Sequence, residues 1–225
     1  KALGNSPHAR YTVVIYTADH GLAMGSHGLL GKQNIYEQSM RCPLILRGPG
    51  VPKGKSSDAY TYVHDLYATV CDFAGIRQPN GNDSQSLRPI MTGEIRSVHD
   101  SVFFPFQDNQ RAVSDGRWKL HIYPKINHRI LFDLANDPHE TKPLAPDAIH
   151  KSHANKMLAL MNSHRKTLGD PCPLGVENPE PKKPNYDNRK RTLDRWQPKW
   201  IREKYFGGRD DPNHRVKKPK SKSAR

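Results

Sequence analysis

Residues 11–32 read YTVVIYTADHGLAMGSHGLLGK, and this stretch decides the fold class. Its first seven residues are β-branched, apolar or aromatic, which predicts a strand, and the apolar centre is typical of a strand buried on both faces. Asp19 and His20 follow the strand directly, and a segment with four glycines then leads to Lys32. Because open α/β sheets build their sites where buried strands end, we expect a site at Asp19 and His20.

The remaining patterns predict two further regions. A short strand over residues 43–47 and a helix over 61–75 complete an α/β unit that we place at 1–98. The pattern then changes to four short strand candidates separated by turns, at 102–104, 111–113, 118–123 and 129–132. We expect residues 99–170 to form a small antiparallel-sheet sub-domain that is closed by a helix over 147–168.

Charge is concentrated in the last part of the chain. The 225 residues contain 36 Lys and Arg against 22 Asp and Glu, and 16 of the basic residues but only 5 of the acidic ones lie in 181–225. We therefore assign 171–225 to a Pro-rich basic tail, with one short helix near 198–206. The basicity alone suggests nucleic acid, but the first 180 residues are close to neutral, so we do not expect a nucleic-acid-binding protein.

Composition excludes other classes. No run approaches the roughly 18 apolar residues that a membrane-spanning helix needs. The chain contains three cysteines without CxxC spacing, which argues against a disulfide framework and against a structural zinc site.

The spacing of Asp19, His20 and Lys32 allows two interpretations. In the first, Asp19 and His20 share a divalent cation, with Asp19 the surer ligand because calcium prefers oxygen, and Lys32 returns over the site to hold an anionic oxygen. In the second, Asp19 caps a turn, His20 bonds to the backbone and Lys32 is solvated. Spacing alone favours the second.

The order of the motifs resembles the sulfatase family, which belongs to the alkaline-phosphatase-like superfamily. The similarity covers most of residues 11–145 and rests on segments 17–21, 25–32, 34–50, 65–76, 85–87, 111–120 and 131–140. The chain is similar to the C-terminal portion of a bacterial-type sulfatase. The resemblance implies an α/β fold: the C-terminal part of a mixed or parallel sheet sandwich, plus a small antiparallel-sheet sub-domain with a closing helix and a basic tail.

The resemblance also implies roles for individual residues. In a sulfuric ester hydrolase of this kind, Asp19 and His20 bind one calcium ion, and Lys32 is the catalytic residue that contacts the sulfate and its leaving oxygen. His27 lies in the loop that shapes the substrate pocket, where it is either a substrate-binding residue or a structural histidine. The cation and Lys32 together offset negative charge on the sulfuryl oxygens.

The family's formylglycine nucleophile is made from a Cys/Ser-x-Pro/Ala-x-Arg motif, and none of the three cysteines lies in one. Ser6 has Arg10 four residues later but precedes the strand that leads to Asp19, so we regard it as a chance match. We expect the nucleophile in an N-terminal half outside this chain, so the isolated chain is expected to be inactive. A sheet without its early strands is also expected to expose apolar surface.

Two alternative functions stay open. One is phosphodiester or phosphonate hydrolysis within the same superfamily, and the other is a non-catalytic fragment that binds anions or polysaccharides. If the protein is a sulfatase, its substrate is a sulfate ester. A sulfated polysaccharide is the expected class, because a basic tail would attract its negative charges. Most enzymes of this family are exported, so the resemblance implies a periplasmic or secreted protein.

Overall fold

The computed structural model describes residues 2–144, 148–182 and 198–206. The chain forms two compact units, Lys1–Glu180 and Pro181–Arg225. In the second unit the described helix is α5 (Lys199–Phe206), which confirms the helix expected near 198–206. Most of the predicted basic tail lies outside the described residues.

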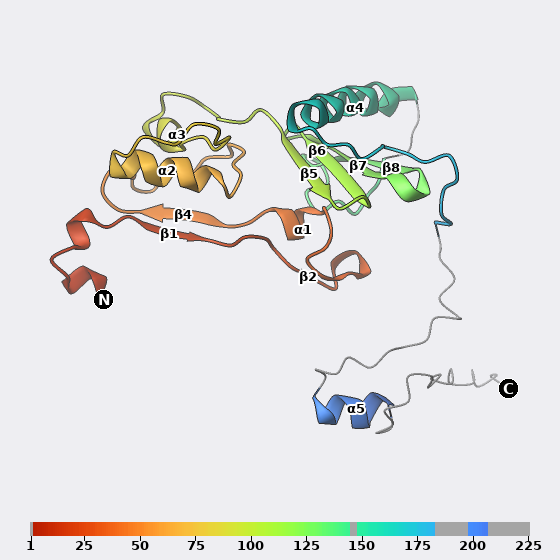
Figure 1. Cartoon of the computed structure of the whole chain (residues 1–225), viewed down its shortest axis with the longest axis horizontal. Helices are drawn as coiled ribbons and strands as arrows, with labels where there is room; N and C mark the ends of the chain where they lie inside the picture. Colours follow the sequence, from red (N-terminus) through yellow and green to blue (C-terminus); the bar gives the residue numbers. More distant parts are fainter. Residues whose placement is uncertain (1, 145–147, 183–197, 207–225) are drawn as a thin grey trace. The chain divides into compact units, whose positions relative to one another are not determined.

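The first part of the larger unit is built on a two-stranded antiparallel ribbon, β1 paired with β4, in which Tyr16 lies opposite Ile45. Between β1 and β4 in the sequence, β2 and β3 pair over two residues and form a small hairpin. Helices α2 and α3 lie on one side of the ribbon (Figure 1). The elements are η1 (Leu3–Asn5), η2 (Ala9–Tyr11), β1 (Val14–Thr17), β2 (Ala23–Met24), η3 (Ser26–Gly28), β3 (Leu30–Gly31), α1 (Glu37–Met40), β4 (Leu44–Arg47), α2 (Asp65–Ala74) and α3 (Arg88–Thr92).

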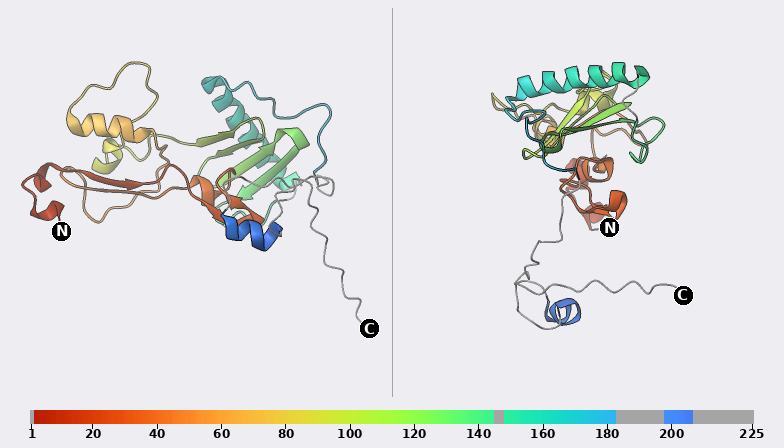
Figure 2. Two further views of the ribbon diagram at one scale, coloured as in Figure 1. Left: turned by 60° about the horizontal axis from the view of Figure 1, so that its bottom comes forward. Right: turned by 90° about the vertical axis from the view of Figure 1, so that its right-hand side faces the viewer.

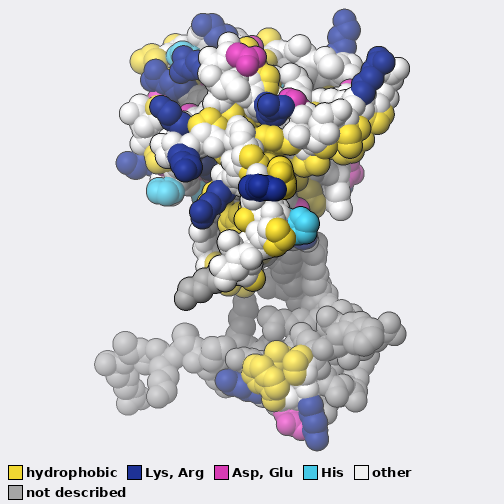
Figure 3. Space-filling view, turned by 90° about the vertical axis from the view of Figure 1, so that its left-hand side faces the viewer, with side chains coloured by type: hydrophobic (Ala, Val, Ile, Leu, Met, Phe, Trp, Pro, Cys, Tyr) yellow, Lys and Arg dark blue, Asp and Glu magenta, His cyan; other side chains and the backbone are white. Residues whose placement is uncertain are grey.

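The prediction that the strand at 11–17 is buried on both faces is wrong for this chain. Val14, Tyr16 and Ile45 are 44%, 62% and 60% exposed. In the described part of the chain β1 pairs with β4 alone, so alternate side chains of the ribbon face solvent. Hydrophobic side chains accordingly reach the surface at this end of the molecule, among scattered Lys and Arg (Figure 3). The predicted exposure of apolar surface is confirmed.

The second part is the small antiparallel sheet that the sequence predicts. Its strands pair in the order β5-β6-β7-β8, each antiparallel to the next. Helix α4 (Ala148–Leu168) packs on β6 and β7 and lies across one face of the sheet (Figure 2). The remaining elements are β5 (Val102–Phe106), β6 (Gln110–Ser114), β7 (Trp118–Tyr123), η4 (Pro124–Ile126) and β8 (His128–Asp133).

The two faces of this sheet differ in character. The face under α4 carries a hydrophobic core made of Phe103, Val113, Leu120, Ile122, Leu131, Met157 and Met161. Because side chains alternate along a strand, Lys119 and His121 of β7 point to the opposite face. Both are fully buried, and Tyr36 packs its ring edge-on against His121. The N-terminal part of the unit therefore covers the polar face of the sheet.

A paired charge closes the sub-domain at the end of α4. The Arg111 guanidinium donates two hydrogen bonds of 2.8 Å to the Asp170 carboxylate, and the two side chains are 4% and 10% exposed. Arg111 holds the pKa of Asp170 down at about 2. Residues 171–180, which composition places in the tail, contact the sub-domain through bonds such as Glu180 N–H to the Lys125 carbonyl, 2.7 Å.

Each helix in the described ranges is too short or too polar to cross a bilayer.

We predict that Asp170→Asn lowers the free energy of unfolding by about 3 kcal/mol at pH 7, because it leaves the Arg111 charge buried without its partner. Asp170 has a lowered pKa in the folded state, so its contribution is present above the unfolded value near 3.8 and is lost as the pH falls toward 2. Urea unfolding followed by circular dichroism from pH 7 to pH 2.5 measures this. The exposed Asp100→Asn is the control, and an equal loss for both variants contradicts the prediction.

Candidate functional site

The three residues predicted to form the site lie together. Asp19 and His20 follow β1, and the β2–β3 hairpin returns the chain so that Lys32 lies beside them. Lys32 Nζ is 2.7 Å from His20 Nε2, and Asp19 Oδ2 is 3.4 Å from the same ring nitrogen. The glycine-rich segment thus folds back on the end of the strand, as the sequence predicts.

The hydrogen bonds of His20 define its tautomer. Its Nδ1 lies 2.7 Å from the Gly21 carbonyl, which can only accept, so Nδ1 carries the proton. Nε2 is then an acceptor, and the Lys32 ammonium donates to it. A neutral imidazole held in this way presents a lone pair on Nε2, which is the form that binds metals.

The site is open to water. The side chain of Asp19 is 81% exposed and that of His20 is 30% exposed. The pKa of the Cys42 thiol is raised above its ordinary value, mainly by burial and to a smaller extent by the negative charge of Asp19. Cys42 is therefore protonated at neutral pH, and the charges at the site are the carboxylate of Asp19 and the ammonium of Lys32.

The backbone of the site loop approaches the chain after Lys32 very closely. The Gly21 N–H donates to the Ser39 carbonyl at 2.8 Å. A Cβ atom on Gly21 would lie 2.1 Å from the Gln38 carbonyl oxygen, a distance that no side chain tolerates. Glycine at this position therefore allows the strand end to lie against α1.

His27 is placed in the hairpin loop with both ring nitrogens engaged. Gln38 Nε2 donates to His27 Nδ1 at 3.1 Å, and His27 Nε2 donates to the Glu140 carbonyl at 2.9 Å. The ring also stacks on Tyr36 with centroids 4.0 Å apart. The backbone of His27 is left-handed, with φ of 56°, a conformation that surrounding contacts must hold. The structure thus joins His27 to the sub-domain.

Sequence reasoning missed the residues that hold the loop. Glu140 lies in a turn, in which its N–H donates to the Asp137 carbonyl at 3.1 Å. Glu140 is in fact fully buried and contacts Glu37, Lys119 and His121. Its 103-residue separation from Glu37 leaves no local signal of the contact.

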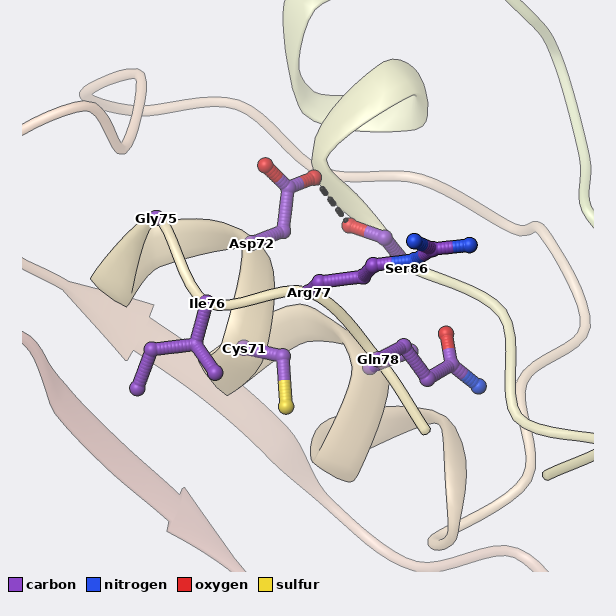
Figure 4. A pocket seen from close by; sticks show the side chains of 8 residues that line it. Cys71, Asp72, Gly75, Ile76, Arg77, Gln78 and Ser86 are labelled. Carbon is purple, nitrogen blue, oxygen red and sulfur yellow. Dashed lines mark hydrogen bonds between the residues drawn. The ribbon is translucent and has the colours of Figure 1, made fainter. Parts of the chain in front are cut away.

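A hollow in the described part of the chain lies away from this site. It measures about 520 Å³ at the end of α2 and is lined by residues that include Cys71, Asp72, Ile76, Arg77, Gln78 and Ser86 (Figure 4). None of Asp19, His20 and Lys32 lines it. Ser86 donates to Asp72 at 2.6 Å, which is the hydrogen bond drawn between them.

The donors at the site are compatible with a cation but incomplete. A carboxylate oxygen of Asp19 and the lone pair of His20 Nε2, which here accepts from Lys32, offer two ligands, while calcium takes about six to eight. Within the ranges that the structure describes, no three His, Cys, Asp or Glu side chains gather closely enough to hold a metal ion. In the described residues, the observed geometry thus brings two potential ligands together at this strand end, the Asp19 carboxylate and the His20 imidazole.

Comparison with known proteins identifies the family. The family described as "N-sulphoglucosamine sulphohydrolase, C-terminal" matches residues 25–167. The chain belongs to the sulfatase family. Delta 4,5-hexuronate-2-O-sulfatase from Bacteroides thetaiotaomicron is 33% identical over 182 residues, which are 76% of this chain and 36% of that protein. The chain thus spans about a third of that relative's length.

Solved structures agree with the fold of a sulfatase. A 2-O GAG sulfatase matches with a TM-score of 0.67 and 30% identity, over 75% of this chain and 39% of the other. A protein solved in complex with its substrate D-glucosamine-2-N,6-O-disulfate matches at 0.64 and 25%, over 72% and 36%. The phosphonate monoester hydrolase of Agrobacterium radiobacter matches at 0.65 and 28%, over 74% and 37%. The chain therefore has the fold of the C-terminal portion of an alkaline-phosphatase-like protein.

We predict that Gly21→Ala lowers the free energy of unfolding by about 2 kcal/mol, because the added methyl group collides with backbone rather than with a side chain that could move away. Urea unfolding of the purified chain measures the loss. Gly4→Ala is the matched control, since nothing lies within 4 Å of its Cβ position. Equal stability of the two variants contradicts the close approach of Gly21 to α1.

Proposed function

We propose that this chain provides the calcium- and sulfate-binding part of a sulfuric ester hydrolase. Asp19 and His20 act as ligands of one calcium ion, and Lys32 binds the sulfate group. The convergence of a carboxylate, a metal-competent imidazole and an ammonium at one strand end carries this proposal. Membership of the sulfatase family supports it.

The geometry supports a definite task for each residue. Lys32 Nζ donates to His20 Nε2, and it can exchange this acceptor for a sulfate oxygen when sulfate enters. A positive charge next to a sulfuryl oxygen stabilises the negative charge that develops there during ester cleavage. Gly21 keeps His20 in the tautomer whose Nε2 faces Asp19 and Lys32. Asp19 and His20 would hold the calcium ion, which would supply a second positive charge near the bound sulfate.

The proposed substrate is a sulfated sugar. The relatives include a hexuronate-2-O-sulfatase, and one similar structure holds a glucosamine disulfate. A sulfated polysaccharide also suits the basic composition of residues 181–225. We further propose that the formylglycine nucleophile lies outside this chain and that the enzyme works in the periplasm or outside the cell.

Hydrolysis of phosphonate monoesters is the second candidate function, because the phosphonate monoester hydrolase of Agrobacterium radiobacter matches this chain about as well as the sulfatases do. Asp19, His20 and Lys32 suit the binding of sulfate and of phosphonate alike, because both are tetrahedral anions. Comparing the affinity of the chain for inorganic sulfate and for methylphosphonate separates the two functions, and tighter sulfate binding supports the sulfatase.

Isothermal titration of the purified chain tests the proposed site. We expect weak calcium binding, with a dissociation constant of about 10⁻³ M, because the described residues offer two protein ligands at this site. Asp19→Asn should abolish it, whereas the exposed Asp58→Asn should leave it unchanged. Calcium binding that survives Asp19→Asn, or no binding by the wild-type chain, contradicts the proposed metal site.

The same titration with sodium sulfate tests Lys32. We expect Lys32→Ala to weaken sulfate binding about tenfold through loss of one charged hydrogen bond, and Lys53→Ala, at an exposed loop position, to have no effect. Equal affinities for the two variants contradict the role of Lys32.

Catalysis by the chain alone gives a further test. Since the proposed nucleophile lies elsewhere, the purified chain should not turn over an aryl sulfate such as 4-nitrophenyl sulfate. Steady-state turnover that Lys32→Ala removes would show that the chain carries its own nucleophile and would contradict that part of the proposal.

A further inference from the structure

The site loop is tied to a part of the chain that contributes no ligand to the site. Glu140 lies in the turn after β8, more than 100 residues from the loop, and its side chain is fully buried. Its main-chain carbonyl accepts the hydrogen bond from His27 Nε2. One residue of the sub-domain thus reaches the tip of the hairpin that precedes Lys32.

The side chain of Glu140 makes a second connection to the same loop. Oε2 accepts a 2.6 Å hydrogen bond from the Glu37 N–H at the start of α1. Helix α1 in turn holds the start and the tip of the loop: the Ser39 carbonyl accepts from the Gly21 N–H, and the Gln38 side chain donates to His27. Glu140 is therefore bonded directly to the tip of the segment that carries the site, through His27, and is linked to its start through α1.

The charges around Glu140 keep it ionised and fixed. Burial opposes its ionisation, but His121 and Lys119 outweigh this effect and hold the pKa of Glu140 below its ordinary value. Lys119 Nζ lies 3.0 Å from Glu140 Oε1 and 2.7 Å from Glu37 Oε1. Burial lowers the pKa of His121 to about 4, so this ring is neutral at pH 7. The single buried ammonium is thus shared by the two carboxylates.

We propose that Glu140 is the positioning residue of the Asp19–His20–Lys32 site. Its carbonyl fixes His27 and its carboxylate fixes α1, so the polar face of β7 sets where the hairpin places Lys32. The role in sulfate binding rests on the proposed function, whereas the restraint of the loop follows from the contacts alone. His27 belongs to the same device, because its left-handed backbone needs the bonds to Glu140 and Gln38.

Native-state hydrogen exchange of the whole chain tests this inference. Glu140→Gln removes the charge and keeps the shape, and His27→Ala removes the loop side of the bond. Both variants should speed the exchange of the Gly25 and Leu29 amides, which are bonded within the hairpin, by about tenfold. In His27→Ala, which leaves the buried charges in place, amides in β6 and β7 should exchange as in the wild-type chain.

Two control variants show whether the effect is specific to Glu140 and His27. His139→Ala and Glu177→Gln change exposed side chains of the same types and should alter neither set of amides. If Glu140→Gln does not fold, His27→Ala carries the test by itself, because the His27 side chain lies outside the hydrophobic core.

The outcomes separate the positioning role from a merely structural one. In His27→Ala, faster exchange spread equally over the hairpin and the sheet, or unchanged exchange of the hairpin, overturns the inference. A selective effect on the hairpin supports it, and a parallel loss of inorganic sulfate affinity extends the support to the site. A selective effect in a chain that binds no sulfate supports the positioning role and counts against the proposed function.

Discussion

The burial of one ammonium group, that of Lys119, constrains the rest of the larger unit. A lysine without exposed surface needs counter-charges, since an ionised group in an apolar setting is very costly without them. Glu37 and Glu140 provide these charges from two segments far apart in the sequence. The chain around α1 and the turn at Glu140 must therefore pack on the polar face of β7, and the position of the site loop follows from that packing.

Local patterns predicted most of the fold. Alternation and turn residues indicated the four strands of the sub-domain, and the apolar periodicity of 147–168 indicated α4. The burial of the strand at 11–17 was mispredicted because an apolar run shows that a strand can be buried, whereas burial itself depends on neighbouring strands. In the described residues β1 has one such neighbour.

Some residues of the site could likewise be predicted from the sequence, whereas others could not. Asp19, His20 and Lys32 could be predicted because they lie within fourteen residues of one another and resemble a known motif. Lys119 and His121 could not, because polar residues that alternate with apolar ones are typical of a face in contact with water. The segment that covers this face lies 82 residues from Lys119 along the chain, and no single-sequence pattern links the two. The exposed side chains of β1 and the exposed carboxylate of Asp19 are close together, because Asp19 follows this strand. A segment that covered β1 would therefore also change how far water reaches Asp19.

We propose that a calcium ion and a sulfate group bind where Asp19, His20 and Lys32 meet. Calcium titration of the ¹⁵N-labelled chain in the presence of sulfate, followed by nuclear magnetic resonance, tests this proposal at the residues themselves. We expect saturable shifts of the His20 ring nitrogens and of the backbone amides around Asp19 and Lys32, with the amides of β5–β8 unchanged. Saturable shifts centred on another acidic group, such as Asp65, with none at His20, would contradict it.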